Sequence, residues 1–420
     1  MADARRTVEA VVRTQYGRLL AFLSSELRDV DDAEDALGEA LVAALESWPN
    51  DGVPSEPGAW LLTVARHRLV DRARRARVRT EQADAVRQLV SDTANSATAG
   101  EMFPDRRVEL LFVCAHPAID PALHAPLMLQ TVLGVDAARI AQAFLVAPAT
   151  MGQRLVRAKR KIREAGIPFR VPPAQELAPR LEAVLEAIYG AYGLGRDEPP
   201  GAEARREDLA DEAIWLARVL RERMPDEPEA RGLLALVLFC DARSEARTSP
   251  EGRYVPLSEQ DPASWSAPAI AEAEAELSEA SRPGRVGRFQ LEAAIQSVHA
   301  DRARSGRTDW EAIVVFYDQL VRLAPTLGAR VAQSAAVAEA SGPAAGLAML
   351  DALDTPAVAT YQPYWAVRAH LLRLLDRPSE SVAAYDRAIG LTEDPTVRRF
   401  LLDRRGRARP PVEIPPSRAP

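Results

Sequence analysis

The sequence predicts an all-α protein, and two observations carry that prediction. Ala, Leu, Arg and Glu dominate the chain of 420 residues while aromatic residues make up only 5% of it, a composition that favours helix over sheet. Apolar residues also recur at helical spacing through most of the chain. Because 47% of the residues are hydrophobic, the chain can fold around sizeable cores, and its length allows about three domains of roughly 150 residues.

Several classes of protein are excluded by the same composition. The longest clean apolar run, Gly232 to Cys240, is less than half of a bilayer span, and Met1 to Arg6 is followed by no apolar segment of a signal peptide. The chain has only two cysteines, Cys114 and Cys240, which are too few for a disulfide framework, and its five histidines are scattered. We therefore expect a cytoplasmic protein with no membrane partner, no metal and no cofactor. No nucleophile–base pair or Gly-rich phosphate loop is evident, so we expect no enzymatic activity.

Three helices are expected in the first 79 residues. Apolar periodicity predicts one over Thr7–Leu27, a second over Ala33–Trp48 and a third from about Pro57 to Arg77. The composition of residues 49–57 predicts a loop between the second and third helices. The expected buried stripe of the third helix is Leu62, Ala65, Leu69, Ala73 and Ala76.

Charge is segregated along the chain although the net charge is only −7. Residues 26–39 hold seven acidic side chains against one arginine, and residues 66–79 hold seven arginines against one aspartate. Residues 154–163 hold six basic side chains and no acidic one. Such blocks indicate contact with a polyanion and with a basic partner. A solvated acidic helix remains the simpler interpretation of residues 31–46 taken alone.

Residues 136–166 predict a helix-turn-helix. Asp136 is placed to cap a short helix, residues 145–147 form the turn, and Pro148 begins a second helix that runs to Ala165. One face of the second helix carries Met151, Leu155, Ala158 and Ile162. The opposite face carries Thr150, Gln153, Arg157, Arg160 and Lys161, with Arg154 and Lys159 on its flanks.

This second helix has the side chains that a recognition helix needs in the major groove of DNA. Thr150, Gln153 and Arg157 are candidates for contacts with base edges. Phosphate contacts are expected from Arg154, Lys159, Arg160, Lys161 and Arg163. A basic helix that simply faces solvent is the alternative.

The third helix offers a second basic surface that would suit a DNA backbone. Its candidate residues are Arg66, His67, Arg72, Arg74, Arg75 and Arg77. Trp48 and Trp60 bracket the preceding loop and could stack on unpaired bases. Their positions on apolar helix faces favour a place in the core instead.

A polar linker is expected over residues 80–104, and residues 174–408 show a repeat signal. The tetratricopeptide pattern sets a small residue, an aromatic residue, a small residue and a proline at fixed offsets in a unit of about 34 residues. Three stretches fit it fully or in part: Ala213, Ala217, Leu220 and Pro225; Ile313, Tyr317, Leu320 and Pro325; and Ser381, Tyr385 and Ala388. An ordinary helical bundle is the alternative. The Pro-rich residues 409–420 are expected to be disordered.

Three segments together resemble a bacterial sigma factor of the extracytoplasmic-function class. Residues 31–41 (DDAEDALGEAL) resemble the region-two helix that binds the polymerase clamp. Residues 60–75 (WLLTVARHRLVDRARR) resemble the helix that faces the minus-ten promoter element, and residues 149–159 (ATMGQRLVRAK) resemble the region-four recognition helix. One branch of this class has a C-terminal extension with tetratricopeptide-like repeats, and residues 112–117, 308–310 and 342–347 are similar to that branch.

The resemblance implies roles for particular residues. It places Asp31, Asp32, Glu34, Asp35 and Glu39 on the clamp of the catalytic polymerase subunit. It places Trp48, Asn50 and Asp51 in a loop that captures a base flipped out of the minus-ten non-template strand, and the 80–104 linker on a path toward the polymerase active centre. Gly152 stands where many class members have lysine, and Ser381 stands at a usual alanine, so the promoter sequence does not follow from the class.

The full prediction is a promoter-recognition subunit whose partners are core RNA polymerase and promoter DNA. Region two is expected over 1–79, a linker over 80–104, a region-four helix-turn-helix over 105–168, the tetratricopeptide-like extension over 174–408 and a tail over 409–420. The extension would regulate activity, either by covering the DNA-reading surfaces or by bracing them. The sequence does not identify the protein or small molecule that would act on the extension. The rival interpretation is a stand-alone DNA-binding regulator or repeat scaffold that does not meet polymerase.

Overall fold

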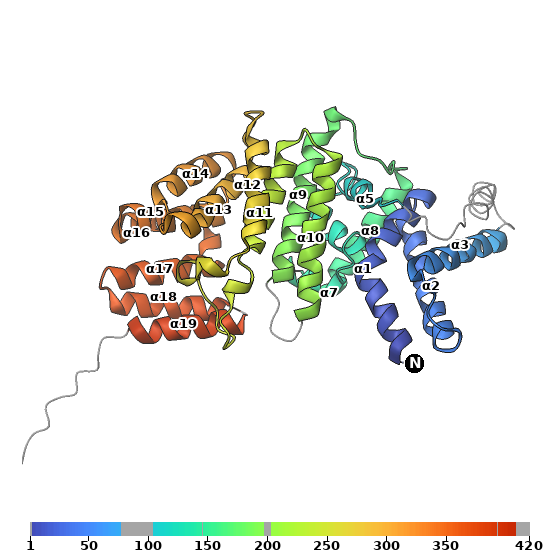
Figure 1. The fold of residues 1–420 in the computed structure, drawn as a ribbon, viewed down its shortest axis with the longest axis horizontal. Helices are drawn as coiled ribbons and strands as arrows, with labels where there is room; N and C mark the ends of the chain where they lie inside the picture. The colour runs from blue at the N-terminus through green and yellow to red at the C-terminus, as the bar shows by residue number, and fades with distance from the viewer. Residues whose placement is uncertain (1, 77–103, 145, 197–202, 393, 409–420) are drawn as a thin grey trace, which may run out of the picture. The chain divides into compact units, whose positions relative to one another are not determined.

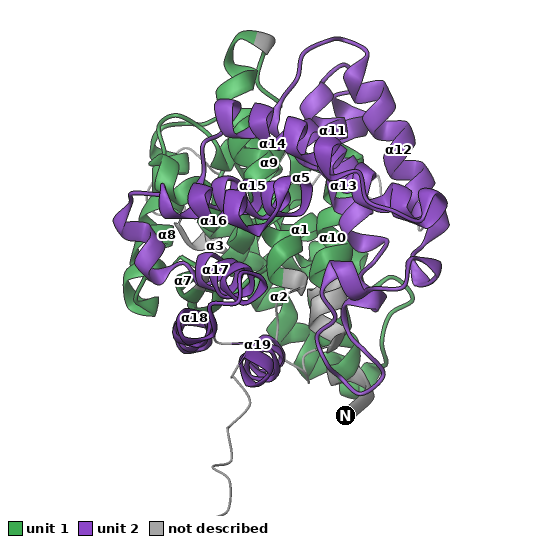
Figure 2. Cartoon of the chain, turned by 90° about the vertical axis from the view of Figure 1, so that its left-hand side faces the viewer, with its two compact units in different colours: residues 1–196, 204–219 green, residues 197–203, 220–420 purple. Residues whose placement is uncertain are grey.

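The structure is a computed structural model that describes residues 2–76, 104–144, 146–196, 203–392 and 394–408. It confirms the all-α fold class, since the described residues form α-helices, short 3-10 helices and a single isolated bridge between Thr248 and Tyr254. The chain divides into two compact units, residues 1–196 with 204–219 and residues 197–203 with 220–420 (Figure 1, Figure 2). Each unit is described separately below.

Unit 1 begins with three helices that pack around one apolar core. They are α1 (Ala2–Leu27), α2 (Val30–Asp51) and α3 (Pro57–Ala76). Asp29 caps α2 by accepting a hydrogen bond from the Asp32 N–H at 3.2 Å. Leu20, Leu37 and Leu61, one from each helix, are fully buried in this core, which is why the three apolar stripes face each other.

The prediction that α2 ends at Trp48 is wrong by one turn. The helix continues through Pro49 to Asp51, and Gly52 ends it with a positive φ of 87° while its N–H bonds the Trp48 carbonyl at 3.1 Å. Pro49 cannot donate a backbone hydrogen bond, so this last turn is held by the bond from the Gly52 N–H, and glycine adopts positive φ without strain. The loop is therefore confined to the few residues before Pro57.

The rest of unit 1 is built from shorter helices. They are α5 (Arg107–Cys114), the 3-10 helix η1 (Pro121–Leu123), α6 (His124–Thr131), α7 (Ala137–Ala143), α8 (Pro148–Glu164), α9 (Ala174–Arg196) and the first part of α10 (Glu203–Arg223). Gly17 of α1 lies against the backbone carbonyl of Val132, where a Cβ would collide with it. Contacts of α1 with α5 and of α2 with α8 join these helices to the first three.

Unit 2 is a series of helices in which sequence neighbours pack on each other. They are α11 (Pro228–Asp241), α12 (Ala267–Ser281), α13 (Arg288–Ser305), α14 (Trp310–Leu323), α15 (Leu327–Ser341), α16 (Pro343–Asp351), α17 (Gln362–Leu374), α18 (Pro378–Leu391) and α19 (Pro395–Ala408). Gly346 of α16 touches Ala338 and the Ser334 carbonyl of α15, so any larger residue would push the two helices apart. The 3-10 helices η2 (Glu245–Arg247), η3 (Leu257–Glu259) and η4 (Pro262–Ser264) lie in the long connection after α11, and η5 (Pro356–Thr360) precedes α17.

The positions singled out by the repeat pattern lie mostly inside the fold. Ile313 and Tyr385 are buried, and Ser381 is fully buried with its hydroxyl donating to the Ala369 carbonyl at 2.8 Å. That bond accounts for a serine at a site where alanine would be usual, because it satisfies the hydroxyl that burial removes from water. The repeat assignment itself stays a prediction. Most of the predicted linker and the whole predicted tail fall outside the described residues.

Candidate nucleic-acid interface

Helix α8 has the two faces that the sequence predicts. Asp136 caps α7 by accepting from the N–H groups of Ala138 and Arg139, both at 3.0 Å, and Pro148 opens α8. The predicted apolar face is buried: Met151, Leu155, Ala158 and Ile162. The predicted polar face is exposed, together with Arg154 on its flank: Thr150, Gln153, Arg157, Arg160 and Lys161. Hydrogen-bond donors and positive charge thus share one accessible surface.

Lys159 departs from this pattern, and its expected place beside the exposed face is wrong. Its side chain is only 7% exposed and donates a hydrogen bond to Glu34 of α2. The Asp31 carboxylate lies 3.8 Å from the same Nζ. Burying an ammonium group is costly unless carboxylates compensate it, and here the acidic start of α2 provides them.

A second ion pair extends the contact between α8 and α2. Arg163 donates to Asp29 at 3.2 Å, and this hydrogen bond raises the pKa of the Arg163 guanidinium above its ordinary value. Burial raises the pKa of Glu34 above its ordinary value, because desolvation of the carboxylate outweighs the attraction of Lys159. Burial raises the pKa of Asp31 in the same way.

The acidic residues of α2 therefore divide into two groups. Glu34 and Asp31 face α8, whereas Asp32 and Asp35 are exposed on another side of the helix. Glu39 is half-exposed, with its carboxylate 3.9 Å from Arg68 of α3. Of the carboxylates assigned to a polymerase contact, Asp31 and Glu34 thus form ion pairs with α8, and Glu39 forms one with α3.

The basic surface of α3 is smaller than predicted within the described part. His67 is exposed, but the Arg66 guanidinium donates to Glu26 of α1 at 3.2 Å and lies 5.2 Å from the Phe22 ring. The expectation that Arg66 is exposed is therefore wrong. The side chains of Arg72, Arg74 and Arg75 lie outside the described residues.

Trp48 is a core residue. Only 3% of it is exposed, and its ring meets that of Trp60 edge-on with centroids 5.4 Å apart. The interpretation of Trp48 as part of a base-capturing loop is thus contradicted in this arrangement, while its position on the apolar face of α2 already favoured the core. Asn50 and Asp51 are exposed in the last turn of that helix.

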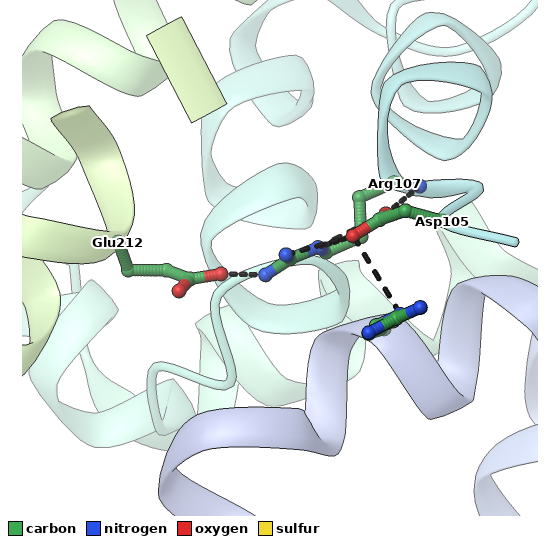
Figure 3. A network of polar contacts seen from close by, with 4 residues as sticks. Asp105, Arg107 and Glu212 are labelled. Atoms are coloured by element: carbon green, nitrogen blue, oxygen red, sulfur yellow. Dashed lines mark hydrogen bonds and ion pairs between the residues drawn. The ribbon is translucent and has the colours of Figure 1, made fainter. Parts of the chain in front are cut away.

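One buried polar network was not foreseen from the sequence. Arg107, at the start of α5, donates to Asp105 at 2.8 Å and forms an ion pair with Glu212 of α10, as Figure 3 shows. Arg18 of α1 approaches Asp105 to 3.9 Å, and the Arg107 guanidinium lies 3.9 Å from the Trp215 ring. An arginine before an apolar helix gives no local signal of such partners, because Glu212 lies far along the chain.

The described ranges contain no candidate metal cluster and no candidate membrane-spanning helix. In those ranges no cluster of three or more His, Cys, Asp or Glu side chains could hold a metal ion. Among the same residues no helix combines the length and the apolarity that crossing a bilayer requires.

Comparison with known proteins assigns the first module. Residues 11–79 match the sigma-70 region 2 family, which covers most of α1 to α3. Residues 180–281 match a family of unknown function, DUF6596, and this match runs from the first turns of α9 to the end of α12. The chain therefore carries a sigma-70 region 2 domain, and the match supports a place among transcription initiation factors.

One bacterial relative matches most of the chain. An uncharacterized protein of Rhizobium meliloti is 40% identical over 370 residues, which cover 87% of this chain and 87% of the relative. The chain belongs to the same family as that protein. No solved structure matches this chain.

Proposed function

We propose that the protein is a sigma factor of the extracytoplasmic-function class that binds core RNA polymerase and directs it to promoters. The observation that carries the proposal is the sigma-70 region 2 match over residues 11–79. The exposed donors and cations of α8 support a second promoter contact.

In this proposal the chain contacts its partners through three surfaces. The start of α2 binds polymerase through Asp31, Asp32, Glu34, Asp35 and Glu39. Helix α8 reads the minus-thirty-five duplex with Thr150, Gln153 and Arg157, and holds its backbone with Arg154, Arg160 and Lys161. Helix α3 and the end of α2 serve the minus-ten element, through His67, Asn50 and Asp51 and the arginines at 72, 74 and 75.

Polymerase binding is tested by charge reversal at the two exposed carboxylates. The double variant Asp32→Lys, Asp35→Lys should lose co-purification with core polymerase, because a basic clamp would then meet like charge. The matched control is Glu311→Lys, Glu339→Lys, which changes the net charge equally at exposed positions of unit 2. Unchanged binding by the first variant would contradict the proposal and favour a stand-alone DNA-binding regulator.

DNA recognition is tested on the polymerase complex with a random duplex library. Arg157→Ala should relax sequence preference at one position and weaken binding by roughly tenfold, as expected for a lost contact with a base edge. Arg160→Ala should weaken binding to all sequences and lower the salt slope by about one. Arg170→Ala, an exposed arginine beyond α8, is the control and should change neither.

The contact between α2 and α8 makes polymerase binding and DNA binding interdependent in this proposal. Polymerase engages Asp31 and Glu34, which releases Lys159 and gives it to the DNA backbone. Glu34→Gln should therefore increase the DNA affinity of the free protein and have less effect once polymerase is bound. Equal DNA affinity of the free variant and the free parent protein would show that the Lys159 contact exerts no such control.

The C-terminal region, from α9 onward, regulates this activity in the proposal. Run-off transcription with and without residues 220–420, a deletion that spares the parts of α9 and α10 in unit 1, separates the two ways in which it could act. Increased output after removal supports inhibition, and lost output supports a brace for the sigma module. Unchanged output contradicts regulation.

A further inference from the structure

Unit 2 contains a cavity that the sigma-factor proposal does not use. It measures about 220 Å³ and lies between the connection around residues 249–259 and helix α19, which are close together in Figure 1. Arginines are the commonest side chains around it: Arg253, Arg399, Arg404 and Arg407. The carboxylates of Glu259 and Asp403 also line it.

Part of the cavity wall is held in place by aromatic and ionic contacts. The rings of Tyr254 and Phe400 meet edge-on with centroids 5.3 Å apart. The Arg404 guanidinium lies 5.0 Å from the Phe400 ring and forms an ion pair with Glu259. The wall therefore has an apolar patch beside an arginine that Glu259 and the Phe400 ring hold in place.

The cavity carries surplus positive charge. Glu259 compensates Arg404, and Arg253 is paired with Glu251 at 3.3 Å. Arg399 and Arg407, by contrast, have no hydrogen-bond or ion-pair partner among the described residues. Burial lowers the pKa of Arg404 below its ordinary value, and the nearby charge of Arg407 adds a smaller effect in the same direction. Asp403 is the one lining carboxylate that the described side chains leave unpaired.

We propose that this cavity binds a phosphoryl group, either as inorganic phosphate or as part of a small organic phosphate. A guanidinium group donates two parallel hydrogen bonds to phosphate oxygens, and a dianion can engage Arg399 and Arg407 together. The cavity is several times the roughly 30 Å³ that one water occupies, so it has room for an organic group against Tyr254 and Phe400. This assignment is independent of polymerase binding.

Isothermal titration of the full-length chain at constant ionic strength tests the assignment. Inorganic phosphate should bind saturably, and Arg399→Ala and Arg407→Ala should each weaken binding about tenfold. The matched control is Arg322→Ala, an exposed arginine of α14, which should bind as the parent protein does. Phenyl phosphate is the second probe: tighter binding than inorganic phosphate supports an organic phosphate, and equal binding supports the free ion.

The absence of saturable phosphate binding would overturn the assignment. So would an equal loss in Arg322→Ala, or equally tight binding of succinate, which would indicate a carboxylate site. A DNA duplex that displaces phosphate would also overturn it in favour of a nucleic-acid surface. Arg399→Lys guards against a folding defect, because it keeps the charge but loses the planar fork and should bind with intermediate affinity.

Discussion

Two ion-paired carboxylates, the half-buried Glu34 in unit 1 and the buried Glu276 in unit 2, show how similar contacts differ in strength. Glu34 is 20% exposed and is hydrogen-bonded to one cation, Lys159. Glu276 is 7% exposed and binds two, accepting from Arg231 at 2.6 Å and also from Arg221. Burial raises the pKa of Glu34, whereas the hydrogen bonds from two arginines overcome the effect of burial and lower the pKa of Glu276.

The difference separates a conditional contact from a permanent one. An ionised Glu34 loses more from dehydration than the single lysine returns, so its contact with α8 can be exchanged for a better partner at little cost. An ionised Glu276 is favoured where it is, so it ties the start of α11 and the end of α10 to α12. The conditional contact is the one between the two surfaces that we assign to polymerase and to DNA.

The largest expected effect that tests this comparison comes from Lys159→Met. The substitution keeps the side chain's bulk but leaves Glu34 buried without its cation, which should destabilise the α2–α8 contact by about 3 kcal/mol. Hydrogen exchange of the α8 amides measures it locally, so that unit 2 does not enter the result.

A double variant shows whether unpaired charge is the cause. Lys159→Met combined with Glu34→Gln removes the uncompensated carboxylate and should recover most of the lost protection. If the double variant is as unstable as Lys159→Met alone, lost packing rather than charge explains the effect.

The second effect, somewhat smaller, comes from Glu276→Gln. It removes the negative charge and one of the two accepting oxygens, so one arginine loses its hydrogen bonds and the other keeps only a neutral acceptor. Because both arginines are partly exposed and water can solvate them, we expect a loss of about 2 kcal/mol. Exchange of the α12 amides measures it, and Glu339→Gln, an exposed glutamate of α15, is the control. A loss no larger than in the control would remove the distinction between the two carboxylates.

The spacing of apolar residues predicted those features of α8 that depend on that helix alone. The 100° turn per residue correctly assigned the buried and exposed faces of α8, from Met151 to Arg157, because helical geometry alone decides them. Lys159 lies at the edge between those faces, where periodicity is ambiguous. Its partner Glu34 is 125 positions away, so only tertiary packing decides its burial.

The same limit explains the other departures. The sequence allowed two interpretations of Trp48, because an aromatic residue at a helix end can pack in a core or stack on a base. In the structure Trp48 packs against Trp60 and lies in the core. Arg107 begins an apolar helix and gave no signal, because a buried arginine is recognised only by the distant acid and aromatic ring around it. Pattern therefore predicts faces and elements, while contacts between elements need the fold.

The smallest expected effect is opposite pH dependence at the two carboxylates. In the native state Glu34 has a raised pKa, so between the ordinary glutamate value of 4.5 and that raised value the native state binds more protons than the unfolded state. The contribution of Glu34 to the free energy of unfolding is therefore present below 4.5 and is lost as pH rises through the raised pKa. Glu276 has a lowered pKa, so its contribution is present above 4.5 and is lost as pH falls through the lowered value.

Each carboxylate is isolated by subtracting its own glutamine variant. Local stability of α8, corrected for the intrinsic pH dependence of amide exchange, should fall with rising pH in the parent protein relative to Glu34→Gln. The local stability of α12 should rise with pH in the parent protein relative to Glu276→Gln, and it should do so over a lower pH range. Asp31 also has a raised pKa and repels Glu34, so both proteins of the first pair carry Asp31→Asn. Slopes of the same sign at the two sites would mean that Lys159 compensates Glu34 as fully as the two arginines compensate Glu276, and the α2–α8 contact would then be as permanent as the one in unit 2.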